Sequence, residues 1–411
     1  MARRRTDRSS RWRLAVACTA AAAVAACATL PRVGAATTTL APHGSCDHAR
    51  VVPVGAALDL SGSGAALGKE YLRGLELSVA QVNDSRGVLT SHACLELMYK
   101  NTGGSDAVAS RAVLDLVNAE GAAFIVAPLT AGEIQAAGSD LARDGVPTAS
   151  FSGLGAIYDP HRYPQLFPLA APVSVTAAAM SSFARARRWT RVGVIGTGDS
   201  DGVLGSVSAD AAVRHDGLAL VASASAVPSA AAALARLRAA SPDVILVTGD
   251  APGVAAVLAA RTSAGWDVPV IADSVAADPE VVAAIGRSSL DGVYAVEPRS
   301  VVASSSSPFD PNLVALRDQL RHVLGRSPLT GSILPYAEVE DAISMFASVS
   351  NSVHTIAPGP VRTYLENANF QGVLASYTFT PDSHGGMGAG QVTVVPVSSL
   401  ADGLFGASTA G

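Results

Sequence analysis

Apolar runs alternate with amphipathic segments along most of the chain, beginning near residue 50. Residues 51–56 form an almost wholly apolar run, and the segment 69–83 then places Leu72, Leu75, Val79 and Val82 on one helical face. The same alternation predicts further strands at 94–99, 124–127, 146–150, 192–195, 218–221, 243–247 and 268–271. It predicts further helices at 106–119, 132–143, 173–187, 203–215, 229–240, 252–264 and 278–286. Apolar strands separated by helices are typical of parallel sheets in doubly wound α/β units.

The strand–helix series falls into two parts, the second starting after residue 172. A helical pattern built on Leu313, Leu316 and Leu320 follows, then another helix near 335–348 and two Thr/Val-rich runs at 373–380 and 391–397. Two doubly wound lobes in one chain leave a crevice between them at the carboxyl ends of their strands. That arrangement suits a ligand held by hinge closure.

The N-terminal residues have the pattern of an export signal. Six arginines lie within the first thirteen residues, and an uncharged apolar run, 14–26, follows and ends at Cys27. Small residues before a cysteine predict a bacterial lipoprotein signal over 1–26, lipidation of Cys27 and a flexible tether over 27–46. The alternative is an uncleaved N-terminal anchor. In both cases we expect an exported protein attached to the outer face of the cell membrane.

Charge and cysteine content narrow the function classes. Without residues 1–26 the chain has 23 Lys and Arg against 33 Asp and Glu, a net charge of −10, which repels nucleic acid. Cys46 and Cys94 are the cysteines that remain beyond Cys27, and both lie at the start of predicted neighbouring strands. An exported chain with such a pair is predicted to join them in a structural disulfide.

Several common catalytic motifs are missing from the sequence. It contains no phosphate-binding Gly-x-x-x-x-Gly-Lys-Ser/Thr loop, no His-Glu-x-x-His and no Cys-x-x-Cys. We therefore expect a protein that is not an enzyme, with no cofactor and no metal site. An exported hydrolase is the weaker alternative, because no nucleophile or metal set is recognisable.

The opening of the folded region resembles the substrate-binding proteins of branched-chain amino-acid ABC transporters. The resemblance is carried by Gly55-Ala-Ala-Leu-Asp-Leu-Ser-Gly-Ser-Gly-Ala-Ala-Leu-Gly68 and by Gly74-Leu-Glu-Leu-Ser-Val-Ala-Gln-Val-Asn83, and it extends by spacing over about residues 50–400. It implies a type I periplasmic-binding fold, two lobes joined by a three-segment hinge. The first lobe would comprise 47–171 and 297–372, the second 172–296 and 373–400, with a tail at 401–411.

By the same resemblance, ligand-binding groups are expected in loops at the strand ends. Hydroxyl groups of Ser61, Thr130, Ser150 and Ser152 are candidates. Five positions depart from the family pattern. Ala131 replaces a usual Ser and Leu154 a common Thr, Leu67 and Asp201 lie where Tyr is usual, and Ser274 lies where an ammonium-binding Glu is usual. The α-amino-acid clamp of the family is thus incomplete.

Acidic residues occupy the corresponding loops of the second lobe. Asp201, Asp250 and Asp273 each follow a predicted strand, and Glu340 or Asp341 is expected to face them from the first lobe. Facing carboxylates suit a cationic ligand, such as an amine or a basic amino acid. The alternatives are that these acids are solvated or cap helices, and that the ligand is a neutral amino-acid-like molecule.

These observations predict a lipid-anchored solute-binding protein that captures an amino acid, amide or amine and delivers it to an ABC transporter permease. The alternative is an extracytoplasmic sensor of the same fold that signals to a partner receptor. Ligand identity, the choice between transport and sensing, and oligomeric state stay open at the level of sequence.

Overall fold

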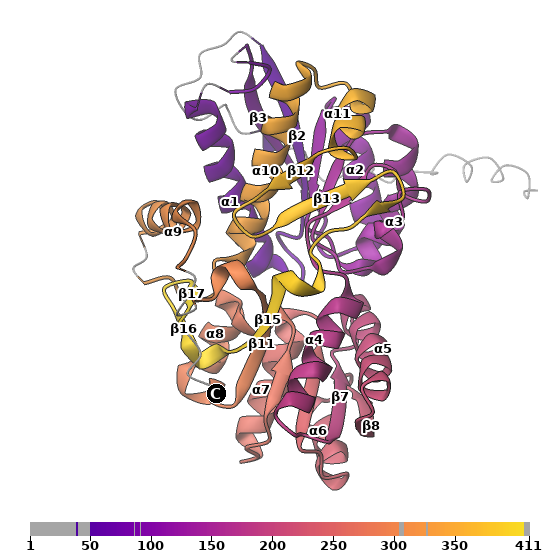
Figure 1. Ribbon diagram of the computed structural model, residues 1–411, viewed down its shortest axis with the longest axis vertical. Helices are drawn as coiled ribbons and strands as arrows, with labels where there is room; N and C mark the ends of the chain where they lie inside the picture. The colour runs from indigo at the N-terminus through magenta and orange to yellow at the C-terminus, as the bar shows by residue number, and fades with distance from the viewer. Residues whose placement is uncertain are drawn as a thin grey trace, which may run out of the picture. The chain divides into compact units, whose positions relative to one another are not determined.

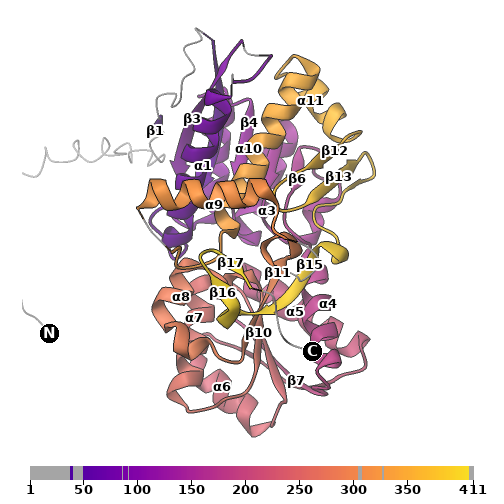
Figure 2. The same cartoon turned by 60° about the vertical axis from the view of Figure 1, so that its left-hand side comes forward.

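Two six-stranded sheets organise the chain (Figures 1 and 2). The computed structural model describes residues 38–39, 50–85, 87–90, 92–303, 308–325 and 328–406. In the first sheet, with order β1-β3-β2-β4-β5-β6, the strands are β1 (Thr38–Thr39), β2 (Val51–Leu58), β3 (Cys94–Asn101), β4 (Phe124–Ala127), β5 (Thr148–Ser150) and β6 (Leu166–Pro168). In the second, with order β15-β11-β10-β9-β7-β8, they are β7 (Arg191–Gly196), β8 (Ala219–Ser225), β9 (Val244–Thr248), β10 (Val270–Ala272), β11 (Val293–Pro298) and β15 (Val392–Pro396).

Helices pack on both sheets, and we call each sheet with its helices a lobe. The first lobe contains α1 (Ala65–Asp84), α2 (Asp106–Asn118), α3 (Ala131–Asp144), α10 (Leu334–Val353) and α11 (Pro358–Leu365). The second contains α4 (Val173–Ala186), α5 (Ser200–His215), α6 (Ala230–Ala239), α7 (Ala251–Ser263) and α8 (Pro279–Ile285). The helix α9 (Pro311–Leu324) lies in the chain between the two sets.

Strand pairing confirms the predicted doubly wound α/β fold. Neighbouring strands run parallel except in the edge pairs β1 with β3 and β11 with β15. The strands β4 and β9 are buried along their whole length, as expected for parallel strands covered on both faces. In the first lobe, Phe124 of β4 stacks on Phe346 of α10 with ring centroids 4.7 Å apart, which joins sheet and helix in one core.

Some elements differ from those predicted. The strands β6 and β11 and the helix α11 have no predicted counterpart. In β6 the strand is only three residues long, and in β11 the apolar run is interrupted by Tyr294 and Glu297. The α11 segment begins Pro358-Gly-Pro, a turn signal that hides the helix behind it.

The last connection between the lobes lies later than expected. The sequence predicts residues 373–400 in the second lobe. Instead, β13 (Ser376–Thr380) pairs with β12 (Asn369–Gln371) and with β14 (Ser383–His384). The strand β14 contacts β6 of the first sheet. The chain therefore reaches the second sheet only between His384 and Val392. The expected tail also differs, because β16 (Leu400–Ala401) and β17 (Leu404–Phe405) form a hairpin and Phe405 is fully buried.

The predicted signal peptide, the predicted lipidation site Cys27 and most of the predicted tether lie outside the described residues, as does Cys46. Cys94 is disulfide-bonded, while its pairing with Cys46 stays a prediction. Among the helices of the described ranges, none is both long and apolar enough to cross a membrane.

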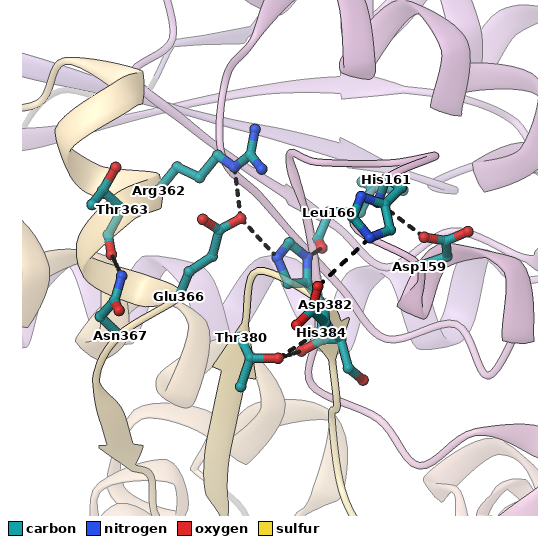
Figure 3. A network of polar contacts seen from close by, with 11 residues as sticks. Asp159, His161, Leu166, Arg362, Thr363, Glu366, Asn367, Thr380, Asp382 and His384 are labelled. Carbon is teal, nitrogen blue, oxygen red and sulfur yellow. Dashed lines mark hydrogen bonds and ion pairs between the residues drawn. The ribbon is translucent and has the colours of Figure 1, made fainter.

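A buried histidine of β14 attaches the β13–β14 hairpin to the first sheet (Figure 3). The side chain of His384 is fully buried, and its Nδ1–H donates to the carbonyl oxygen of Leu166 in β6. Its Nε2 lies 3.3 Å from a carboxylate oxygen of Glu366, which also accepts a hydrogen bond from Arg362 at 2.7 Å. The imidazole stacks on Phe167 with centroids 4.4 Å apart. Burial lowers the pKa of His384 below its usual 6.5.

Replacement of His384 by Ala is expected to lower the free energy of unfolding by about 1–3 kcal/mol, because a buried hydrogen bond and ring packing are lost together. Urea unfolding measures the change. His161→Ala is the control: that side chain is 75% exposed, and the expected change is within about 0.5 kcal/mol. Equal losses in the two variants would contradict the anchoring role.

Candidate functional site

A cavity of about 510 Å³ lies between the two lobes, where the sequence predicts a crevice. Its walls come from segments that follow parallel strands in both sheets, because such segments gather at the carboxyl edges. From the first lobe these are the segments at 59–71, 128–133 and 151–153; from the second they are those at 199–205, 248–252 and 273–280, together with 296–298 of β11. The cavity is large enough for a small metabolite.

An aromatic pair forms part of the first-lobe wall. The rings of Tyr71 and Phe151 stack with centroids 5.6 Å apart, and both line the cavity. The hydroxyl group of Tyr71 donates to a carboxylate oxygen of Glu338 at 2.8 Å. This wall therefore offers a flat apolar surface with a carboxylate at its edge.

Acidic side chains dominate the polar lining. Among the described residues that line the cavity, eleven are Asp or Glu, and none is Lys, Arg or His. Four of the eleven are occupied by local backbone amides. These cap acids, which accept hydrogen bonds from N–H groups of their own loops or helix N-termini, are Asp59, Glu133, Asp199 and Asp250.

Four other acids form a second set, and we call Asp273, Asp278, Glu297 and Glu338 the inner acids. Asp278, Glu297 and Glu338 are 4%, 0% and 6% exposed. Asp273 Oδ1, Asp278 Oδ2 and both carboxylate oxygens of Glu297 are buried without a hydrogen-bond partner in the described structure. Buried polar atoms are nearly always paired, so these four acceptors indicate room for a donor that is not part of the chain.

Burial and mutual repulsion make the inner acids hard to ionise. Burial raises the pKa of Asp273 to about 8, and nearby Asp201 and Asp199 add to the rise. Burial likewise raises the pKa of Glu338 to about 8, against the hydrogen bond from Tyr71, which lowers it. The pKa values of Asp278 and Glu297 also lie well above the ordinary range, mainly through burial and then through neighbouring carboxylates. A positive charge in the cavity would relieve this repulsion.

Two hydrogen bonds join the lobes beside the cavity. The backbone N–H of Ala131 donates to Asp201 Oδ1 at 3.1 Å, and the N–H of Gly132 donates to Ser200 Oγ at 3.0 Å. Both amides lie in the first turn of α3, whose N-terminus carries partial positive charge. The carboxylate of Asp201 thus occupies the anion position of α3 from the opposite lobe, and burial raises its pKa to about 6.

Metal binding finds no support in the arrangement of the acids. Within the described ranges, no group of three or more His, Cys, Asp or Glu side chains is placed to hold a metal ion. The second-lobe carboxylates belong to β11 or to segments that follow β10, β9 and β7, which are successive strands of the sheet, so they are spread along its edge. The lining is therefore suited to an extended organic group more than to a single ion.

A family model described as periplasmic binding protein matches residues 51–402. The chain belongs to that family. The predicted resemblance and the type I periplasmic-binding fold are confirmed. The protein is accordingly a solute-binding protein of an extracytoplasmic family whose members bind substrates.

Solved structures share the fold of this periplasmic binding protein at low sequence identity. A type 1 periplasmic binding protein from Bordetella pertussis superposes with a TM-score of 0.75 at 20% identity, covering 84% of this chain and 96% of that one. The branched-chain amino-acid transporter substrate-binding protein LivJ from Streptococcus pneumoniae, solved with isoleucine, gives 0.72 at 20% identity over 84% and 99%. The leucine-binding protein LivK from Thermotoga maritima gives 0.70 at 17% identity over 81% and 93%. No curated protein sequence shows significant similarity to the chain.

Most of the predicted site residues of this periplasmic binding protein lie at the cavity. They are Leu67, Thr130, Ser152, Asp201, Asp250, Asp273 and Ser274. Their contact with a ligand stays a prediction. Of these, Thr130 caps α3 in a capping box with Glu133. Asp250 caps α7, as the helix-cap alternative for the acids predicts.

The other four candidates are not among the lining residues. Ser61 accepts a hydrogen bond from Asn101, and Ser150 accepts one from the N–H of Ser152. Ala131 acts through its backbone N–H on Asp201. Glu340 accepts from the Ser344 hydroxyl group at 2.8 Å, one turn farther along α10.

Several lining residues have no counterpart in the sequence prediction. Asp278 has the pattern of a helix cap before Pro279, and it does occupy that position, but its side chain makes no cap hydrogen bond. Glu338, and neither Glu340 nor Asp341, lines the cavity from α10. Glu297 is the single acid of the otherwise apolar strand β11. A lone charged residue in a buried strand is unusual, and this feature of the sequence indicates a residue of the site.

Proposed function

We propose that the protein captures a small amino-acid-like or amine ligand between its two lobes and delivers it to an ABC transporter permease. The observation that carries this proposal is a cavity lined from both lobes at the carboxyl ends of their strands. A ligand in such a cavity contacts both lobes at once. It therefore stabilises the arrangement in which the lobes are joined.

The two hydrogen bonds between the lobes beside the cavity would hold the lobes together. In this proposal Asp201 and Ser200 of the second lobe accept the first-turn amides of α3 when the lobes close. The permease would recognise the closed pair of lobes. Ligand and permease recognition are then coupled, because the ligand binds the closed state more tightly than the open one.

Export and anchoring complete the proposal. The six arginines, the apolar run 14–26 and the small residues before Cys27 support cleavage of a lipoprotein signal. A diacylglyceryl group on Cys27 would hold the protein at the outer face of the membrane, near its permease.

Replacement of Ala131 by Pro is expected to weaken binding about tenfold or more, because the N–H that donates to Asp201 disappears. Proline is well accepted at the first position of a helix, so folding should persist. The measurement is isothermal titration with leucine, isoleucine, glutamine, arginine, ornithine, putrescine, agmatine and butylamine, together with uptake of the tightest binder by cells with and without the protein.

Ala230→Pro is the matched control. Ala230 is the first residue of α6, after the N-cap Ser229, and it does not line the cavity. Binding and uptake should equal those of the unaltered protein. Absence of binding by every compound would refute the proposed capture, and binding without any change in uptake would refute delivery to a permease.

A further inference from the structure

We propose that the ligand is a small organic dication without a carboxylate, an aliphatic diamine or a guanidino-amine whose two charges meet acids at opposite ends of the cavity. This inference rests on the proposed function and narrows it. It follows from the absence of basic side chains among the described lining residues and from the buried carboxylate oxygens that have no partner there.

A carboxylate on the ligand finds no cationic partner. The described lining contains eleven acids and no Lys, Arg or His. A helix N-terminus can also hold an anion, and α3 begins at the cavity wall. There Ala131 already donates to Asp201 and Gly132 to Ser200. The carboxylate of Asp201 thus occupies the N-terminus of α3. The carboxylate of a zwitterionic amino acid would therefore enter an acidic cavity without a positive partner.

The unpartnered oxygens call for donors. Glu297 is fully buried with neither carboxylate oxygen bonded, and Asp273 and Asp278 each have one buried oxygen without a partner in the described structure. All three side chains line the cavity. An ammonium group carries three N–H donors and a guanidinium five, which matches this set of acceptors. Ionised and paired, such carboxylates form strong charge-assisted hydrogen bonds.

The acids form two groups with Asp273 between them, in the order of the strands of the second sheet. Asp199 and Asp201 follow β7, at the contact between the lobes, whereas Glu297 lies in β11, three strand positions away. Asp273 and Asp278 follow β10, the neighbour of β11. A molecule with one positive charge satisfies one group only. Two charges separated by a short chain can serve both, and the apolar faces of Tyr71 and Phe151 offer a surface for the methylene groups between them.

A metal ion does not fit the same acids. Over the described residues no three of them converge as metal ligands. A dication with its charges at two ends matches the spread of the carboxylates better than a point charge does.

Matched pairs of compounds test the inference. Agmatine and arginine differ only by a carboxylate, and so do putrescine and ornithine. In isothermal titration with the purified protein we expect at least one decarboxylated compound to bind about tenfold or more tightly than its amino-acid partner, than butylamine and than isoleucine. Agmatine and putrescine also distinguish a guanidino-amine from a diamine.

Each contrary result has a separate meaning. If arginine, ornithine or isoleucine binds as tightly as the dications, the inference fails and the proposed capture of a solute stands. If butylamine equals putrescine, the second charge is not recognised and the inference also fails. If no compound binds, the inference and the proposed function fail together.

Substitution of Glu297 by Gln provides a second test. The variant should lose about tenfold or more in affinity for the dication, because one ion pair is removed from a buried site. Its melting temperature without ligand should not fall, since an unpaired buried carboxylate is removed at nearly constant volume. Glu96→Gln, in β3 and away from the cavity lining, is the control and should leave affinity unchanged. Unchanged affinity in Glu297→Gln would overturn the inference.

Discussion

Replacement of Asp341 by Ala should lower the free energy of unfolding by about 2–4 kcal/mol, because three buried donors lose their acceptor at once. The carboxylate accepts the backbone N–H of Val373 at 2.6 Å, the N–H of Leu374 at 3.1 Å and the hydroxyl group of Tyr377 at 2.8 Å. These bonds fix the segment that enters β13 against α10. Asp341 is 1% exposed, so water cannot replace them.

Urea unfolding of the variant measures this loss. Asp382→Ala removes a carboxylate whose side chain is 92% exposed, in the β13–β14 turn, and should change stability by no more than about 0.5 kcal/mol. Asp341→Asn keeps one acceptor oxygen and should fall between the two. A loss in Asp341→Ala no larger than in the exposed control would show that this junction is not held by Asp341.

Without ligand, the protein should become less stable as pH rises from about 6.5 to about 8, by about 4 kcal/mol. Burial raises the pKa values of Asp273 and Glu338 to about 8, from ordinary values of 3.8 and 4.5, and that of Asp341 to about 7. The native state therefore binds more protons than the unfolded state across this interval, and stability falls with pH. His384, whose lowered pKa acts in the opposite direction, does so mainly below its usual 6.5.

Urea unfolding at the two pH values provides the measurement, and Asp273→Asn identifies the source. The groups that interact with Asp273 are Asp199 and Asp201 at the lobe contact, Asp278 and Glu297 in the inner cavity, and the N–H of Gly249, which donates to its Oδ2. The variant should show a clearly smaller dependence on pH, and Asp382→Asn should keep the full dependence. Stability that is constant or rises over this interval would contradict the raised pKa values.

The regular part of the fold was predictable because its signals are local. The apolar run of β9 and the amphipathic pattern of α1 depend on neighbouring residues alone. The elements that were missed depend on partners far along the chain. The strand β11 tolerates Glu297 because it lines a cavity, and β14 lies in the first lobe because His384 bonds Leu166, 218 residues earlier.

The candidate site was predictable in position and less so in composition. Strand ends placed Asp201 and Asp273 correctly at the cavity, because parallel strands bring their carboxyl ends to one edge. On α10 the sequence predicts that Glu340 or Asp341 faces the cavity, two or three residues beyond the acid that does so. Glu338 lines the cavity, whereas Asp341 faces the β13 entry, since residues one turn apart on a helix can be used by different neighbours.

The sequence by itself determined the doubly wound fold and the acidity of the lobe-two loops, both of which follow from residue type and spacing. Only the tertiary structure decided what each carboxylate does. Asp250 accepts a hydrogen bond from the backbone N–H of Gly253 at the N-terminus of α7, Asp201 accepts one from the opposite lobe, and Glu297 has no hydrogen-bond partner among the described residues. The chemistry of an acid depends on which donors surround it, and those donors come from segments distant in the chain.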